Sequence, residues 1–236
     1  GHDVLIFSLE MARSELMAKS ISRHTVIEVL DKGGDMKNAK TVRGITAGVR
    51  YANYNDTEKE LIKNAVTAYS DYAKHIYITE GVGDLGARQI RETVEKHVQY
   101  TGNTPLVIID YLQILAPYNE RATDKQNTDK AVMELKRISR DFKTPVIGIS
   151  SFNRDNYNNS VSMQSFKESG AIEYSSDVLI GLQLKGAGDK DFDPTEAKKK
   201  NPREIELVIL KNRNGQTGAK IPLEFYPLFN YFTEMN

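Results

Sequence analysis

Apolar residues along the chain form two repeating patterns, and the first is a set of unbroken apolar runs. Such runs occupy residues 4–8, 106–110, 145–150 and 177–184, with a shorter one at 76–79. Because they do not alternate with polar residues, they are typical of strands covered on both faces. We therefore expect a buried parallel sheet built from these segments.

The second pattern is helical and separates these runs. Apolar residues recur every three or four positions, which predicts helices with one buried face each. Thr57 and Glu60 have the spacing of a capping box at the start of one helix. Strand alternating with helix predicts a doubly wound α/β layer. The expected buried faces are Ala12, Leu16, Met17 and Ile21; Ile62, Ala65, Val66 and Tyr69; Ile90, Val94 and Val98; and Ala131, Leu135, Ile138 and Phe142.

The C-terminal part of the chain departs from this pattern. Segments 204–215 and 219–232 have the composition of strands and are joined by Asn-Gly and Thr-Gly turn signals, so we expect antiparallel strands added at one edge of the sheet. Residues 185–204 are polar and rich in Gly, Pro and Lys, which predicts a loop. No segment has the composition of an interdomain linker, so we expect residues 1–236 to form one domain.

Composition narrows the possible functions. Lys+Arg and Asp+Glu are both 32, and this zero net charge excludes a polybasic nucleic-acid binder, so an anionic partner must be held by local arrangement. The chain has no cysteine, which excludes disulfides and thiolate metal sites and is compatible with the cytoplasm, where we expect the protein. No apolar run reaches the roughly 18–20 residues of a membrane span. The four histidines do not cluster at ligand spacing, so we expect no zinc site.

Polar side chains follow three of the predicted strands. Asp110 closes one run, Glu10 follows another, and Ser150 and Ser151 follow a third. Ligands of open parallel sheets bind beyond the carboxyl ends of the strands, where these side chains would meet. One carboxylate there can serve Mg²⁺ and a second can polarise an attacking water. An acid at a strand end can also be only a helix cap or a solvated loop residue.

Five motifs occur in an order that resembles the RecA-like domain of DnaB-type replicative helicases. The resemblance covers residues 4–232 and implies an α/β, RecA-like P-loop NTPase fold, with a mainly parallel sheet flanked by helices and a C-terminal antiparallel hairpin. The motifs are "FSLEM" at 7–11, "LVIIDYLQIL" at 106–115, "LKRISRDFKTPVIGISSFNR" at 135–154, "SFKESGAIEYSSDVLIGL" at 165–182 and "LKNRNGQTGAKIPLEF" at 210–225.

The resemblance implies roles for individual residues in the hydrolysis of ATP with Mg²⁺. Asp110 would serve Mg²⁺ as the Walker B acid, and Glu10 would activate water. Lys211 and Arg213 would reach the γ-phosphate bound by a neighbouring subunit, a contribution worth about 10³–10⁵ in rate for an arginine finger. Such contacts imply a head-to-tail hexameric ring. Ser151 stands where the family usually has Gln, and the further nucleotide contacts would be Gln113, Ser150 and Asn212.

The resemblance also implies that single-stranded DNA passes through the ring, with primase and a helicase loader as protein partners. The polar loop at 154–170 would follow the phosphate chain without reading bases. Loop 117–128 is a second candidate. Both could equally be plain surface loops. The DNA contacts in the first loop would be Arg154, Asn156, Asn158, Lys167, Glu168 and Gly170.

One family element does not occur in these residues. The phosphate-binding loop G-x-x-x-x-G-K-[ST], which the family has upstream of "FSLEM", is absent, as is the helical N-terminal domain. We therefore expect a truncated domain with apolar surface exposed where the missing strand and helix would pack, and little or no ATPase activity from these residues alone. A catalytically inert RecA-like assembly or DNA-binding module is the main alternative. A dinucleotide-binding enzyme, suggested by "GVGDLG" at 81–86, is a lesser one.

Overall fold

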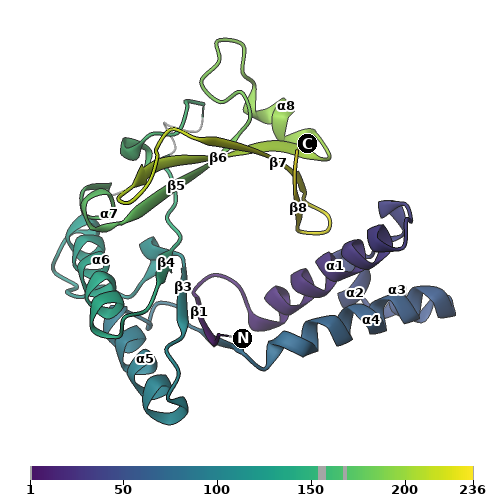
Figure 1. Ribbon diagram of the computed structural model, residues 1–236, viewed down its shortest axis with the longest axis horizontal. Helices are drawn as coiled ribbons and strands as arrows, with labels where there is room; N and C mark the ends of the chain where they lie inside the picture. The colour runs from purple at the N-terminus through teal and green to yellow at the C-terminus, as the bar shows by residue number, and fades with distance from the viewer. Residues whose placement is uncertain (1, 154–157, 167–168, 236) are drawn as a thin grey trace.

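The computed structural model describes residues 2–153, 158–166 and 169–235, which contain two four-stranded sheets. The first sheet is parallel, as the unbroken apolar runs predict, and its strand order is β2-β1-β3-β4. Figure 1 shows it at the centre of the molecule. Its strands are β1 (Val4–Ser8), β2 (Ile76–Glu80), β3 (Leu106–Asp110) and β4 (Val146–Gly148).

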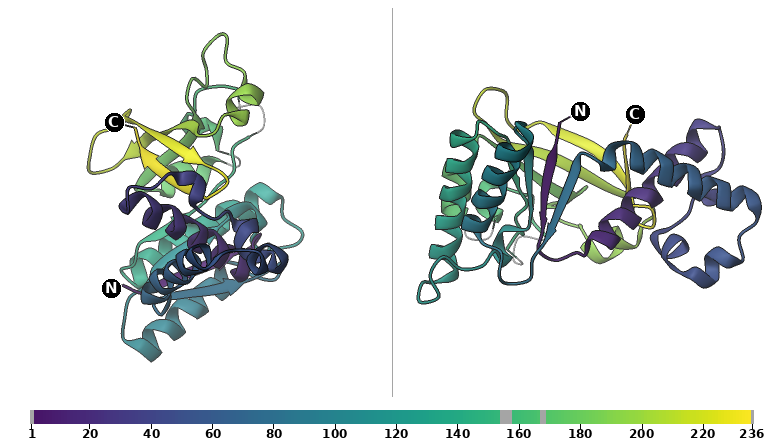
Figure 2. Two further views of the ribbon diagram at one scale, coloured as in Figure 1. Left: turned by 90° about the vertical axis from the view of Figure 1, so that its right-hand side faces the viewer. Right: turned by 90° about the horizontal axis from the view of Figure 1, so that it is seen from below.

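Helices connect the parallel strands. Between β2 and β3 lies α5 (Ala87–Thr101), and α6 (Asp124–Asp141) lies between β3 and β4. These two helices sit together on one side of the sheet, whereas the helices between β1 and β2 form an arm on the other side (Figures 1 and 2). The arm comprises α1 (Arg13–Asp31), α2 (Val42–Thr46), α3 (Gly48–Ala52) and α4 (Asp56–Ala73). No helix in the described part of the chain is long and apolar enough to cross a membrane.

The main core lies between the parallel sheet and the pair α5 and α6. Phe7 and Ile109 of the sheet are fully buried there with Ile90 of α5 and Ile138 of α6. The predicted buried faces of both helices are confirmed, and Phe142 packs against the same core from just beyond α6. Truncating one of these side chains to Ala would cost about 2–5 kcal/mol.

The second sheet is antiparallel, with the order β5-β6-β7-β8. The prediction that these strands extend the edge of the parallel sheet is wrong, because among the described residues they pair with one another and with no strand of that sheet. The polar segment before β6 also differs from the predicted loop, since it holds α8 (Pro194–Lys199), capped by the side chain of Asp193. The strands are β5 (Val178–Leu184), β6 (Arg203–Asn212), β7 (Lys220–Tyr226) and β8 (Tyr231–Glu234).

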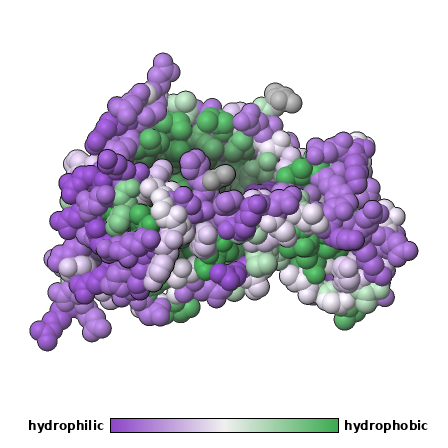
Figure 3. Space-filling view, turned by 60° about the horizontal axis from the view of Figure 1, so that its bottom comes forward, coloured by the Kyte–Doolittle hydropathy of each residue, from purple (hydrophilic) through white to green (hydrophobic). Residues whose placement is uncertain are grey.

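The unbroken apolar run at 177–184 does not produce a strand covered on both faces. Every second side chain of β5 is exposed, with Ile180 at 48% and Leu182 at 47%. In the antiparallel register Leu182 pairs with Leu207, which pairs in turn with Ile221, so one face of this sheet is apolar. Figure 3 shows hydrophobic side chains gathered in a hollow on the surface. The described residues therefore expose apolar surface on the antiparallel sheet, and the expectation that such surface lies where the missing strand and helix would pack stays a prediction.

The helical arm has a small core of its own. Val26 and Val29 of α1 pack there with Phe229, which lies in the turn between β7 and β8. The buried face of α1 differs from the predicted one, because it contains Ser22 and Thr25, whose hydroxyls bond the main-chain oxygen of Lys40.

The start of α4 also differs slightly from the prediction. Its capping box is formed by Asn55 and Glu58, two positions before Thr57 and Glu60. Of the predicted buried face, Ile62, Ala65 and Tyr69 are buried and Val66 is 40% exposed.

Candidate functional site

The parallel register brings the two predicted acids to one edge of the sheet. Ser8 at the end of β1 is the register partner of Asp110 at the end of β3. One residue further, the amide of Leu9 donates a 2.8 Å hydrogen bond to the main-chain oxygen of Asp110. Glu10, the next residue, is exposed, and its charge acts on the half-buried Asp110. The peptide bond after Asp110 is cis.

The electrostatics of Asp110 are those of a carboxylate short of cationic partners. Burial raises the pKa of this carboxyl, and the negative charge of Glu10 raises it further, while Lys19 lowers it. A nearby cation would relieve both effects, because it favours the ionised form. Carboxylate oxygen is also the ligand type that Mg²⁺ prefers. The donor therefore fits a magnesium ion, although no group of three His, Cys, Asp or Glu side chains that could hold a metal occurs in the described residues.

The side chain of Gln113 joins the loop after β3 to the loop after β4 by hydrogen bonds. Gln113 lies in the 3₁₀ turn after β3, and its amide nitrogen donates a 2.8 Å hydrogen bond to the hydroxyl of Ser150. Its amide oxygen accepts a 3.2 Å bond from the backbone nitrogen of Ser151. The loops after β3 and β4 are thus one connected rim, with Ser150 partly buried and Ser151 exposed.

The predicted finger residues lie in a different group, at the end of β6. The ammonium of Lys211 donates a 2.6 Å hydrogen bond to the carbonyl of Glu173, in the last turn of α7 (Ser169–Ser175). Arg213 forms a 3.0 Å ion pair with Asp177, which also receives Lys136 of α6. These cations lower the pKa of Asp177, Lys136 most of all. Exposed ion pairs of this kind contribute about 0–1 kcal/mol each to the stability of the fold.

Asn212, the third residue predicted there, takes part in the turn after β6. Its side-chain oxygen accepts a 3.3 Å bond from the backbone nitrogen of Asn214. Within the described residues, no hydrogen bond or ion pair joins Lys211, Asn212 or Arg213 to Glu10 or Asp110. One chain therefore holds the acids and the finger residues as two separate groups.

Four of the predicted DNA contacts lie outside the described residues, namely Arg154, Asn156, Lys167 and Glu168. The remaining two are placed. Asn158 is exposed, and its carbonyl accepts a 3.0 Å bond from the backbone nitrogen of Gly188. Gly170 lies in α7 with open space beside its α-carbon.

The segment after Asn158 is fixed on β5. The backbone nitrogen of Val161 donates a 2.7 Å bond to the buried side chain of Gln183. A Cβ on Gly181 would lie 2.6 Å from the side chain of Val161, so glycine permits this close approach. The antiparallel sheet thus carries an inner part of the predicted DNA loop, around Val161.

The second predicted DNA loop carries an exposed aromatic ring with two cations close to it. Arg88 lies 5.6 Å and Lys130 5.0 Å from the ring centroid of Tyr118. Tyr118 itself is 55% exposed. Cations near an aromatic face are attracted by its quadrupole, and such a surface also suits stacking with bases.

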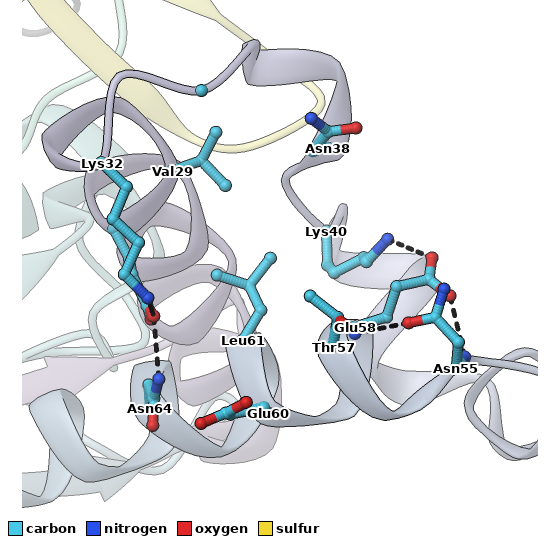
Figure 4. A pocket seen from close by; sticks show the side chains of 12 residues that line it. Val29, Lys32, Asn38, Lys40, Asn55, Thr57, Glu58, Glu60, Leu61 and Asn64 are labelled. Carbon is cyan, nitrogen blue, oxygen red and sulfur yellow. Dashed lines mark hydrogen bonds and ion pairs between the residues drawn. The ribbon is translucent and has the colours of Figure 1, made fainter.

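A cavity of about 540 Å³ lies in the helical arm, between α1 and α4 (Figure 4). Four of its five charged side chains form ion pairs, Lys40 with Glu58 at 2.6 Å and Lys32 with Glu28 at 2.6 Å. It contains neither of the strand-end acids. Because it lies away from the strand-end acids and both of its lysines are already paired, we assign it no role in the predicted chemistry.

Sequence reasoning missed a buried cluster at the opposite edge of the parallel sheet. Asp3 accepts hydrogen bonds from His75 at 3.0 Å, from His97 at 3.1 Å and from Asn103 at 3.2 Å. These bonds, led by that from His75, lower the pKa of Asp3. The contributing residues lie far apart in the sequence, so no local motif signals the cluster. Its place before β1 makes it a structural tie between β1, β2 and α5.

Comparison with solved structures identifies the class of fold. A solved ATPase domain superposes with a TM-score of 0.79 at 21% identity, covering 100% of this chain and 75% of that one. A DnaB-like replicative helicase, described with its interactions with primase, also gives 0.79, at 22% identity, covering 100% of this chain and 51% of that one. The predicted RecA-like α/β fold is therefore confirmed.

The chain belongs to the DnaB-like helicase C-terminal domain family, whose model matches residues 1–234. Among characterised proteins, it is 27% identical over 243 aligned residues to the replicative DNA helicase DnaB of Leifsonia xyli subsp. xyli, covering 99% of this chain. It is 28% identical over 236 residues to the replicative DNA helicase DnaC of Bacillus subtilis, covering 98%. In both cases it spans 46% of the relative's length. Family membership argues against the dinucleotide-enzyme alternative.

Proposed function

We propose that this chain is the motor domain of a replicative DNA helicase, which couples hydrolysis of Mg-ATP at subunit interfaces to movement along single-stranded DNA. The observation that carries the proposal is the meeting of Glu10 and Asp110 at the carboxyl ends of adjacent parallel strands. Family membership supports the same activity. The relatives are about twice as long, so the activity is proposed for the whole protein.

Asp110 and Glu10 have distinct roles in this proposal. Asp110 sits at a fixed strand end, and its half-buried carboxylate would hold Mg²⁺. Bound there, Mg²⁺ neutralises charge on the phosphates. Glu10 is exposed at the same edge of the sheet and would orient and polarise the attacking water as a general base. Gln113, Ser150 and Ser151 would line the nucleotide along the same rim, with Ser151 too short to span the distance that a Gln would.

Lys211 and Arg213 would act on the nucleotide held by a neighbouring subunit. Two features support this role: they lie on the antiparallel sheet, and Arg213 keeps 58% of its side chain exposed. A residue that reaches the nucleotide of a neighbouring subunit requires a head-to-tail contact between subunits. Such contacts close into a ring when the rotation between neighbouring subunits allows it. We propose a hexameric ring, with ATP and Mg²⁺ at each interface and Asn212 beside the nucleotide.

The DNA path would run along the segment from Arg154 to Gly170, which includes Asn156, Asn158, Lys167 and Glu168. The seating of residues 158–161 on β5 supports this, because it links the segment to the sheet that bears Arg213. Primase and a loader are proposed as partners of the whole protein, and a structural relative is described with primase. We place this machinery in the cytoplasm.

The proposal is tested by ATP hydrolysis in the full-length gene product with and without single-stranded DNA. Glu10→Gln should reduce the DNA-stimulated rate by about 10²–10⁴-fold, the range for a general base. Glu95→Gln, which changes an exposed glutamate of α5 in the same way, is the matched control and should retain the wild-type rate. Undiminished hydrolysis by Glu10→Gln would refute the assignment. The 236-residue polypeptide by itself should hydrolyse little or no ATP.

An inert assembly or DNA-binding module is the second candidate. The same assay separates the two functions. A full-length gene product that binds single-stranded DNA without hydrolysing ATP would support the inert module.

A further inference from the structure

Asp177 contacts two cations through different oxygens. Its Oδ1 atom lies 3.0 Å from the guanidinium of Arg213, and its Oδ2 atom lies 2.5 Å from the ammonium of Lys136. Arg213 is the proposed finger, whereas Lys136 belongs to α6 and has no proposed catalytic role. One carboxylate therefore joins the finger to the helix that packs against the main core.

Main-chain geometry fixes the Asp177–Arg213 pair. Asp177 immediately precedes β5 and Arg213 immediately follows β6, and the first register partners of these strands are Val178 and Asn212. The amide of Arg213 also donates a 2.9 Å hydrogen bond to the carbonyl of Asp177. The two side chains consequently start from adjacent, hydrogen-bonded positions in a sheet, unlike an ion pair between two loops.

The pair leaves the guanidinium available to a ligand. Asp177 engages one terminal nitrogen of a group that carries five N–H donors in a rigid fork. The Arg213 side chain is still 58% exposed in this position. The remaining N–H donors of Arg213 can therefore bind a phosphate from solvent while Asp177 keeps the guanidinium oriented.

We propose that Asp177 is a positioning residue for Arg213, an inference that rests on the proposed function of the finger. It reduces the number of rotamers that the long arginine side chain samples and holds the guanidinium ready for the γ-phosphate of the adjacent subunit. Preorganisation of this kind lowers the barrier of the chemical step without tightening substrate binding. Lys136 binds the other oxygen and ties Asp177 to α6.

The experiment compares Asp177→Asn with Lys136→Met in the full-length gene product. Both changes break the link between α6 and the start of β5, but only the first removes the carboxylate from Arg213. For Asp177→Asn, kcat of DNA-stimulated hydrolysis should fall by about tenfold, while KM should stay within about twofold of wild type. This fall in kcat is smaller than the factor of about 10³–10⁵ that an arginine finger contributes to the rate. Lys136→Met should keep kcat within about twofold of wild type.

A binding measurement gives a readout separate from turnover. The affinity of Asp177→Asn for ADP with aluminium fluoride, which imitates the transferring phosphoryl group, should fall by about tenfold while its affinity for ADP is unchanged. Melting temperatures of all variants should stay near wild type, since Asp177 is half exposed.

Two results would overturn the inference. Wild-type kcat in Asp177→Asn would show that the pair does not prepare the finger. An equal loss in Lys136→Met would show that Asp177 only links α6 to β5. Arg213→Ala separates this failure from failure of the proposed function: if that variant hydrolyses ATP normally, the finger assignment itself is wrong. When the inference holds, adding Asp177→Asn to Arg213→Ala should reduce the rate no further.

Discussion

The carboxylate of Glu10 raises the pKa of Asp110, which burial has already lifted above the ordinary value of 3.8. The folded state therefore binds a proton on Asp110 more readily than the unfolded chain does. Between the ordinary pKa and the raised one, the folded state holds more protons, so stability falls as pH rises through that window. At neutral pH the ionised Asp110 destabilises the fold.

Asp110→Asn should consequently increase the free energy of unfolding at neutral pH, and the gain should vanish at pH values below 3.8. Urea denaturation at a series of pH values measures this. Asp141→Asn is a control that should instead decrease the free energy of unfolding at neutral pH. Arg91 lowers the pKa of Asp141, so the ionised Asp141 stabilises the fold above its ordinary pKa. Lower stability of Asp110→Asn at neutral pH would contradict the electrostatic account.

Glu10→Gln should lower the pKa of Asp110 without returning it to the ordinary value. The change removes the second-largest cause of the shift and leaves the largest, burial, in place. Titration of the Asp110 carboxyl carbon by NMR in isotope-labelled protein is the measurement. An unchanged pKa would mean that the two side chains do not face each other in solution.

Asp3→Ala should destabilise the fold by about 1–3 kcal/mol, because the buried His97 loses the acceptor for its ring nitrogen. His75 is partly exposed and can turn to water. The pKa of Asp3 is lower in the folded state than in the unfolded chain. The ionised Asp3 therefore stabilises the fold at pH values above its ordinary pKa, and this contribution is lost as pH falls through the pKa of the folded state. Urea denaturation should therefore show the difference from wild type shrinking in acid.

Asn103→Ala is the matched control for Asp3, because it removes one donor from the same carboxylate and leaves both histidine bonds. Its effect should be smaller than that of Asp3→Ala. Equal losses in the two variants would indicate that the histidine contacts contribute nothing.

Gly181→Ala should displace the segment at 158–161, because the new Cβ would lie 2.6 Å from Val161. Overpacking of this kind costs about 1–3 kcal/mol. Hydrogen exchange at the Val161 amide, which donates to Gln183, should accelerate. Gly48→Ala is the control, since nothing lies within 4 Å of its added Cβ. Wild-type exchange in Gly181→Ala would contradict the described seating.

The sequence was sufficient to predict the parallel sheet and the meeting of its acids. Unbroken apolar runs indicate parallel strands, and the carboxyl ends of parallel strands necessarily share one edge. Glu10 and Asp110 could therefore be paired before any coordinates were known. The functional roles of these residues remain predictions.

The other elements could not be predicted correctly, because contacts between residues far apart in the sequence determine them. The run at 177–184 resembles β3 in its consecutive apolar residues, yet β5 pairs antiparallel with β6 and exposes Ile180. In α1, counting apolar residues selected the wrong face, because Ser22 and Thr25 are buried against the backbone of Lys40. Hydrogen bonds to a distant loop decided that burial, and helical periodicity does not contain them.

The small core that joins α1 to the turn after β7 has a consequence for folding. Val29 and Phe229 come from opposite ends of the chain, so their contact closes a loop of nearly the whole polypeptide. Contacts of such large sequence separation slow folding, because chain entropy is lost before the contact is gained. The contact between the arm and the turn after β7 should therefore form late, after the two sheets have each formed.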